Sequence, residues 1–167
     1  MKLNSNIFHP RQLVFIVLLF FQTGFMAAQK KKQITKNKIQ SCTVTQISGK
    51  KKLFDSKNTY NQAGLLIEET NYNDSGVFIS TKKYNYNKHG DLITEQKFNQ
   101  QNQMLEIRTM KYNFQNQKVE EMLFNSKFRL IKKFLFSYDS KGLKLEKKTF
   151  DAQNHLLSTK KYTYTYY

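Results

Sequence analysis

The stretch "YNYNKHGDLITEQKF", residues 84–98, contains the pattern that decides the fold of this 167-residue chain. From Tyr86 it reads aromatic, Asn, two variable residues, Gly and then, three positions later, an aliphatic residue. Eight such units follow one another in steps that alternate between 12 and 14 residues, so the true period is 26 residues. The units start at Tyr60, Tyr72, Tyr86, Phe98, Tyr112, Phe124, Tyr138 and Phe150.

Two positions of the unit favour a turn. The second is always Asn or Asp, whose side chain can accept a hydrogen bond from the backbone two residues further on. The fifth is Gly or Asn in every unit except the one with Phe128, and these residue types tolerate the left-handed conformation that closes a type I turn with a bulge. We therefore predict a hairpin turn at each unit, with structural roles for Asn61, Gly64, Asn73, Gly76, Asn87, Gly90, Asp139 and Gly142.

The residues between the turns favour strands. Stretches such as residues 91–98 are rich in Thr, Ile and aromatic residues and lack Pro. Each 26-residue repeat (12 + 14) then holds two strands and two turns. The sequence predicts an all-β fold, an antiparallel β-meander of about nine strands, with a final strand at residues 161–167 and one or two degenerate strands before Tyr60. The alternating unit lengths favour a curled single sheet or a partly closed barrel.

The even spacing of the units predicts that equivalent side chains share one face of the sheet. The opposite face would then carry the aliphatic residues of the eighth position. The first face is expected to hold Tyr84, Tyr86, Phe98, Met110, Tyr112, Phe124, Phe136, Tyr138, Phe150, Tyr162 and Tyr164.

The N-terminal part of the chain differs in composition from the repeats. Basic residues precede a nine-residue apolar run, residues 13–21, and small residues follow at Ala27 and Ala28, which is typical of a secretory signal peptide over residues 1–28. The run is shorter than the ~20 residues that a spanning helix needs, so no transmembrane span is expected after cleavage. Residues 29–45 are Lys-rich and predict a flexible basic arm, and residues 46–167 form the repeat domain.

The repeat resembles a known family. "YDSKGLKLEKKTF" from Tyr138 and "YNKHGDLITEQKF" from Tyr86 are similar to the tyrosine–aspartate (YD) repeats of bacterial RHS and teneurin-like proteins. The resemblance covers about residues 60–167, with Asn in place of Asp in six of the eight units. It implies a curled β-sheet at a cell surface, and for the function it suggests a component of an RHS-type toxin-delivery or immunity system as an alternative.

Residue patterns typical of catalysis or metal binding are missing from the sequence. There is no zinc-ligand spacing, phosphate-binding glycine loop or nucleophile elbow, and the one cysteine, Cys42, cannot form an intramolecular disulfide. His89 and His155 fall in or beside turns, where we expect them to face solvent. We predict no catalytic residue, no metal site and no cofactor.

The tyrosines are the remaining candidates for a site. A tyrosine ladder can stack on sugar rings while lysines pair with acidic groups of the same ligand, and the same residues can instead form the core of the sheet. Both interpretations stay open at this point. The candidate ligand-binding residues are Tyr86, Tyr112, Tyr138, Tyr164 and Tyr166.

The formal net charge of +16 fits several anionic partners. We expect an exported, secreted or periplasmic, non-enzymatic binding or scaffolding module of the cell envelope, with carbohydrate binding as one use of its tyrosines. Its expected partner is an anionic glycan, a cell-envelope surface or another envelope protein. Nucleic acid would also suit the charge and the aromatic residues, but it conflicts with export.

Overall fold

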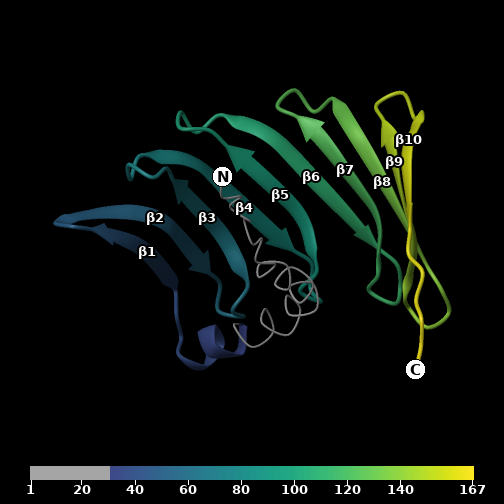
Figure 1. Ribbon diagram of the computed structural model, residues 1–167, viewed down its shortest axis with the longest axis horizontal. Coiled ribbons are helices and arrows are strands. Elements are labelled where there is room, and N and C mark those ends of the chain that lie inside the picture. The colour runs from purple at the N-terminus through teal and green to yellow at the C-terminus, as the bar shows by residue number, and fades with distance from the viewer. Residues whose placement is uncertain (1–30) are drawn as a thin grey trace, which may run out of the picture.

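The computed structural model describes residues 31–167 and confirms the predicted all-β fold. Within these residues, ten antiparallel strands form one sheet in which each strand pairs with the next one along the chain (Figure 1). Of the two expected forms, the structure has the open curled sheet, because β1 and β10 stand at the two ends of the strand order. The strands are β1 (Ser41–Ser48), β2 (Lys51–Tyr60), β3 (Leu66–Tyr72), β4 (Phe78–Tyr86), β5 (Leu92–Phe98), β6 (Met104–Tyr112), β7 (Lys118–Asn125), β8 (Leu130–Tyr138), β9 (Lys144–Asp151) and β10 (Leu156–Lys161).

Each of the eight units forms a hairpin turn of the same kind, as the turn between β4 and β5 illustrates. The amide of Gly90 donates to the carbonyl of Asn87 at 3.0 Å, and the amide of Asn87 donates to the carbonyl of Asp91 at 2.9 Å. The side-chain oxygen of Asn87 accepts from the amides of His89 and Asp91, both at 2.9 Å. The fifth residue has a positive φ in every unit, at Gly64, Gly76, Gly90, Asn102, Asn116, Phe128, Gly142 and Asn154.

A β-bulge follows every one of these turns. Asn85 pairs with Thr94, whereas its neighbour Tyr86 pairs with Leu92, so Ile93 is an extra residue on β5. The same shift of register occurs at the start of each of the other units. A bulge bends its strand and increases the local twist, so a bulge at each turn curls the whole sheet in one sense.

The bulges also overturn the prediction of a single aromatic face. Tyr84 pairs with Glu95, but Phe98 pairs with Thr81, and residues 81 and 84 point to opposite sides of β4. The extra residue of each bulge inverts the side-chain alternation, so even spacing in sequence does not preserve the face. Successive units therefore alternate: Tyr60, Tyr86, Tyr112 and Tyr138 lie on one face, and Tyr72, Phe98, Phe124 and Phe150 lie on the other.

The eighth-position aliphatics are the extra residues of the bulges and are also divided between the faces, against the prediction that they share one. Ile93 alternates with Glu95 on β5, whereas Leu105 alternates with Ile107 on β6, which pairs with Phe124. Many of them remain exposed, namely Ile67, Ile79, Leu105, Ile131, Leu145 and Leu157.

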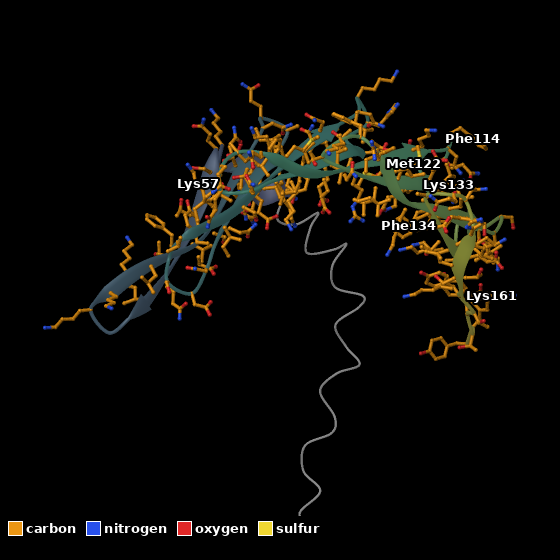
Figure 2. All side chains as sticks on the ribbon, turned by 90° about the horizontal axis from the view of Figure 1, so that it is seen from above. Lys57, Phe114, Met122, Lys133, Phe134 and Lys161 are labelled. Carbon is orange, nitrogen blue, oxygen red and sulfur yellow. The ribbon has the colours of Figure 1, made fainter. Side chains whose placement is uncertain are left out.

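The face that carries Tyr60 and Tyr86 is the more enclosed one, and we call it the concave face. The buried side chains of the sheet, Tyr60, Ser80, Met110, Glu121 and Phe136, all belong to it. Figure 2 shows Phe134 on the inner side of the bend and Lys133, the preceding residue, on the outer side. No described side chain is fully buried, because residues 31–167 form a single-layered sheet with only one short helix beside it.

The structure differs from the expected basic arm at residues 29–45. Residues 31–36 form a short helix, and Ser41–Ser48 form β1, which pairs with β2. The side chain of Ile34 is only 6% exposed, so this segment packs against the sheet. The helix lies beside the first turn of the repeats, at Gly64. The predicted signal peptide, residues 1–28, lies outside the described residues.

The last strand also differs from the prediction. It runs from Leu156 to Lys161 rather than over residues 161–167, although the amide of Tyr162 still donates to the carbonyl of Leu145 at 3.0 Å. Its position follows from the turn at Asp151, because the strand starts directly after the turn, with Leu156 opposite Phe150, and contains the bulge at its second residue. Among residues 31–167, no helix has the length and apolar character needed to span a membrane.

Candidate functional site

The predicted tyrosine ladder is present on the concave face, and its hydroxyl groups are engaged within the sheet. The hydroxyls of Tyr86, Tyr112, Tyr138 and Tyr164 donate to backbone carbonyls 20 residues earlier, over distances of 2.7, 3.0, 2.8 and 2.9 Å. The four acceptors are the carbonyls of Leu66, Leu92, Lys118 and Lys144.

These contacts give the tyrosines a structural role. Each ring reaches across to the start of the preceding strand, and burial raises the pKa of Tyr86, Tyr112 and Tyr138. Successive rings are two strands, or about 9.5 Å, apart. A ligand could therefore contact the faces of these rings but not their hydroxyl groups, which are already hydrogen-bonded.

Tyr84 extends this pattern on β4. Its hydroxyl donates to Oε2 of Glu69 at 2.8 Å, and burial, followed by this hydrogen bond, raises its pKa far above the usual range of tyrosine. Tyr166, the last of the predicted ligand-binding residues, lies beyond β10 and is 68% exposed, with Nζ of Lys141 5.0 Å from its ring centre. The predicted tyrosines thus fall at intervals along the sheet and do not form one compact site.

A group of cations around Phe136 is the most concentrated feature of the concave face. Nζ of Lys118, Lys144 and Lys147 lies 5.0, 5.2 and 5.7 Å from the centre of the Phe136 ring. Nζ of Lys147 also lies 4.4 Å from the ring centre of Phe134. We call Lys118, Phe134, Phe136, Lys144 and Lys147 the Phe136 cluster. It brings together side chains from β7, β8 and β9, three neighbouring strands.

One carboxylate is built into the edge of this cluster. Glu121 is 5% exposed and forms ion pairs of 2.5 Å with both Arg108 and Lys118. Burial alone would raise the pKa of Glu121, but the hydrogen bonds from Lys118 and Arg108 outweigh it and lower the pKa. Lys118 is therefore held by an internal partner.

The other two lysines of the cluster have no such partner. Within residues 31–167, no carboxylate lies within 4.0 Å of Nζ of Lys144 or Lys147. Burial lowers the pKa of Lys147, and the positive charges of Lys118, Lys160 and Lys144 lower it further, which outweighs the attraction of Glu121. The cluster thus has more positive than negative charge in a partly desolvated place.

Sequence reasoning missed this cluster, although the repeat contains a signal for it. The seventh position of the unit faces the tyrosine that starts it, and there Leu66 and Leu92 are followed, 26 residues apart, by Lys118 and Lys144. An aliphatic position thus becomes cationic in the C-terminal half. This change in the sequence indicates that the surface becomes positively charged. The residues that Lys118 and Lys144 contact, however, depend on the register set by the bulges.

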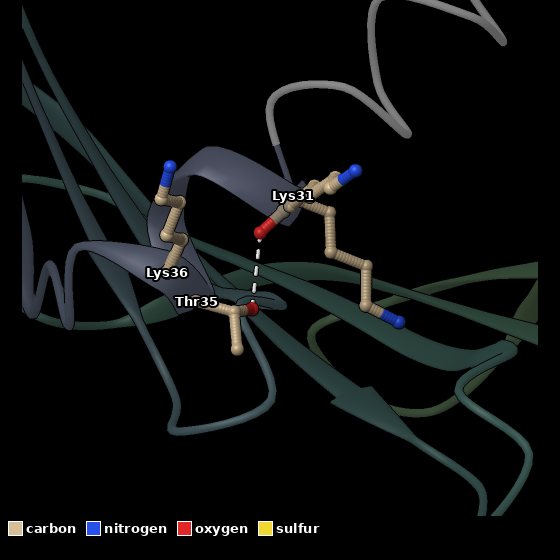
Figure 3. A pocket seen from close by; sticks show the side chains of 4 residues that line it. Lys31, Thr35 and Lys36 are labelled. Atoms are coloured by element: carbon tan, nitrogen blue, oxygen red, sulfur yellow. Dashed lines mark hydrogen bonds between the residues drawn. The ribbon is translucent and has the colours of Figure 1, made fainter.

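Two shallow hollows lie near the short helix. Figure 3 shows the one lined by Lys31, Lys32, Thr35 and Lys36, where the hydroxyl of Thr35 donates to the carbonyl of Lys31 at 3.0 Å. The other is lined by residues such as Tyr84, Tyr86 and His89.

Acidic and histidine side chains do not gather elsewhere in the described part of the chain. Nδ1 of His155 lies 3.0 Å from Oδ2 of Asp151 within one exposed turn. Among residues 31–167, no group of three or more His, Cys, Asp or Glu side chains could hold a metal ion.

Comparisons with known proteins do not identify a family. No protein-family model matches the sequence, and no curated protein is significantly similar to it. Among solved structures, a porin-like protein from Bacteroides uniformis has a TM-score of 0.40 at 12% identity over 71% of this chain, and the chain spans 48% of that protein. TarM has a TM-score of 0.29 at 14% identity over 75% of this chain and 22% of its own.

A protein of unknown function from Bacteroides fragilis is also similar, with a TM-score of 0.30 at 15% identity over 77% of this chain and 96% of its own. Each of these TM-scores lies below 0.5, so the likenesses carry no functional conclusion.

Proposed function

We propose that the protein is exported, to the periplasm or the cell surface, and acts there as a non-enzymatic binding module for an anionic glycan. The observation that carries the proposal is the Phe136 cluster, in which the ammonium groups of Lys144 and Lys147 lack a carboxylate partner within the described residues. A desolvated positive surplus of this kind favours an external anion. Exposed aromatic rings beside it favour a ligand with sugar rings.

The curvature of the sheet narrows the choice of partner. The cluster lies on the concave face, which a flat bilayer surface cannot approach closely, whereas a chain-like ligand can lie along it. Nucleic acid would satisfy the same charges but conflicts with the proposed export. The apolar run at residues 13–21 supports export, and the resemblance to YD repeats supports a place at the cell surface.

The test is a glycan array probed with the protein purified after expression of the full chain with its N-terminal segment. We expect signals on carboxylated or sulfated glycans that exceed those on neutral glycans of the same backbone length, and that fall as salt is added. Binding to neutral glycans at the same level, or to none of the glycans, would contradict the proposed function.

A further inference from the structure

We infer that the Phe136 cluster is a subsite for one anionic group on a sugar ring, with Lys144 and Lys147 as the two charged contacts and Tyr162 as the neighbouring stacking surface. The inference rests on the proposed function and deepens it, because it names the place and the chemistry of recognition.

The positive charge of the cluster is not balanced by carboxylates among residues 31–167. Of the three ammonium groups around Phe136, that of Lys118 is paired with Glu121. A ring face attracts a cation, but it carries no net charge and leaves the repulsion between Lys144 and Lys147 in place. Lys160 adds to this repulsion, because it pairs with Lys147 across β9 and β10. An anion between Lys144 and Lys147 would relieve it.

Lys144, which has no carboxylate partner among residues 31–167, lies beside an accessible ring. Nζ of Lys144 is 5.4 Å from the ring centre of Tyr162, which is 37% exposed. Phe136 itself is only 9% exposed and cannot accept a sugar ring. The hydroxyl of Tyr164 is held by the carbonyl of Lys144, which fixes the chain beside Tyr162. A pyranose stacked on Tyr162 would thus bring its acidic substituent to Lys144.

The donors define the class of anion. An ammonium group is a compact charge with three donors and has no planar fork, so it accepts the oxygens of a carboxylate or of a sulfate equally well. The shared chemistry is therefore an anionic oxygen carried by a pyranose ring. Two glycan probes, one with carboxylates alone and one with sulfates, distinguish these sources.

The convex face offers a matched control. Nζ of Lys83 and of Lys133 each lies 5.1 Å from one ring centre, that of Phe98 and Phe150. These distances lie within the range of 4.4–5.7 Å found in the cluster, but each of the two lysines stands over a single ring, and Lys133 donates a hydrogen bond to Asn154. Replacing both with Gln removes the same charge as replacing Lys144 and Lys147.

The experiment measures dissociation constants of the full chain for three fluorescent hexasaccharides, namely hyaluronan, chondroitin sulfate and neutral chitohexaose, and for an oligothymidylate of similar charge. We expect Lys144→Gln with Lys147→Gln to weaken binding of at least one acidic hexasaccharide about tenfold, since two charge-assisted contacts are lost. Lys83→Gln with Lys133→Gln should stay within about twofold of the parent, since more distant charges are screened.

An equal loss in both double variants would overturn the inference in favour of general charge attraction. Parent-like binding by both would overturn it as well, while the proposed function would stand. Failure of the parent to bind any hexasaccharide would overturn both, and tighter binding of the oligothymidylate would overturn the glycan class. If the cluster variant does not fold, Tyr162→Ala replaces it, with an expected loss of about threefold or more, and an unchanged constant would contradict the inference.

Discussion

The fifth residue of each turn is held in the left-handed region, and the eight turns differ in how well their residue suits that conformation. Gly and Asn suit it, and they occupy seven of the eight positions. Phe128 adopts a φ of 57° with a bulky side chain that remains 68% exposed. Asn125, which opens this turn, makes the same backbone hydrogen bonds as its counterparts, and the same bulge follows. The surrounding hairpin therefore determines the conformation of Phe128.

The surroundings of the turn glycines distinguish the first turn from the others. A Cβ at Gly90 would have Leu65 as its nearest neighbour, at 3.9 Å, whereas a Cβ at Gly64 would lie 2.5 Å from Oγ1 of Thr35. We expect Gly90→Asn to change the free energy of unfolding by less than about 1 kcal/mol. Gly64→Asn should cost about 2 kcal/mol more, because the short helix must move.

Urea denaturation of the two glycine variants measures both values. Equal losses at Gly64 and Gly90 would mean that the helix does not rest on the first turn in solution. A large loss at Gly90 alone would contradict the left-handed turn itself.

At the scale of the elements, the bulges explain both the success and the failure of sequence reasoning. The strands and turns could be predicted because turn residues such as Asn87 and Gly90 act locally. The face on which each side chain lies could not be predicted, because Ile93 resembles any other strand residue in the sequence. Only the pairing of Tyr86 with Leu92 shows that Ile93 is the extra residue of a bulge. The hydrogen-bond partners of the tyrosine hydroxyls depend on the same register, so they could not be predicted from the sequence either.

The candidate site was predicted only in part for the same reason. Tyr138 and Tyr164 were expected near a ligand, and both lie beside the Phe136 cluster through the contacts of their hydroxyls with Lys118 and Lys144. The position of Lys147 opposite Phe136 depends on the register of β8 with β9, which follows from a bulge. Composition indicated a positive charge but not its location.

The ion pairs of Glu121 on β7 with Arg108 on β6 and with Lys118 predict that the stability of the fold depends on pH. Because the pKa of Glu121 is lowered in the folded protein, its ion pairs stabilise the fold above its ordinary pKa of about 4.5, and this contribution is lost as the pH falls below that value. Glu121→Gln should cost about 2–3 kcal/mol at pH 7, because it leaves Arg108 and Lys118 without their buried partner. The loss should shrink as the pH approaches 3.

Thermal melts between pH 3 and pH 7 check this expectation. Glu120→Gln is the matched control, since it removes the same charge from the adjacent position on the other face, where Lys111 is its exposed partner. A similar loss in both variants at pH 7 would contradict the special role of Glu121.

At the scale of the whole molecule, the sheet exposes two different faces. Bulges at every turn curl it, so one face encloses Met110, Glu121 and Phe136 while the other remains open. A single layer cannot bury a large core, so its lysines lie over aromatic rings and cover part of them with their aliphatic stems. On the concave face this places Lys144 and Lys147 together, which makes that face the proposed binding face.

Lysine footprinting by amine acylation and mass spectrometry tests whether the ligand lies on the concave face. The full chain is labelled with and without the acidic hexasaccharide that it binds best, and the rate at each lysine is compared. We expect labelling of Lys144 and Lys147 on the concave face to slow about fivefold or more when the ligand is bound. Lys83 and Lys133, on the convex face, should react at unchanged rates. Protection of the convex lysines, or equal protection at all four positions, would contradict the assignment of the concave face as the binding surface.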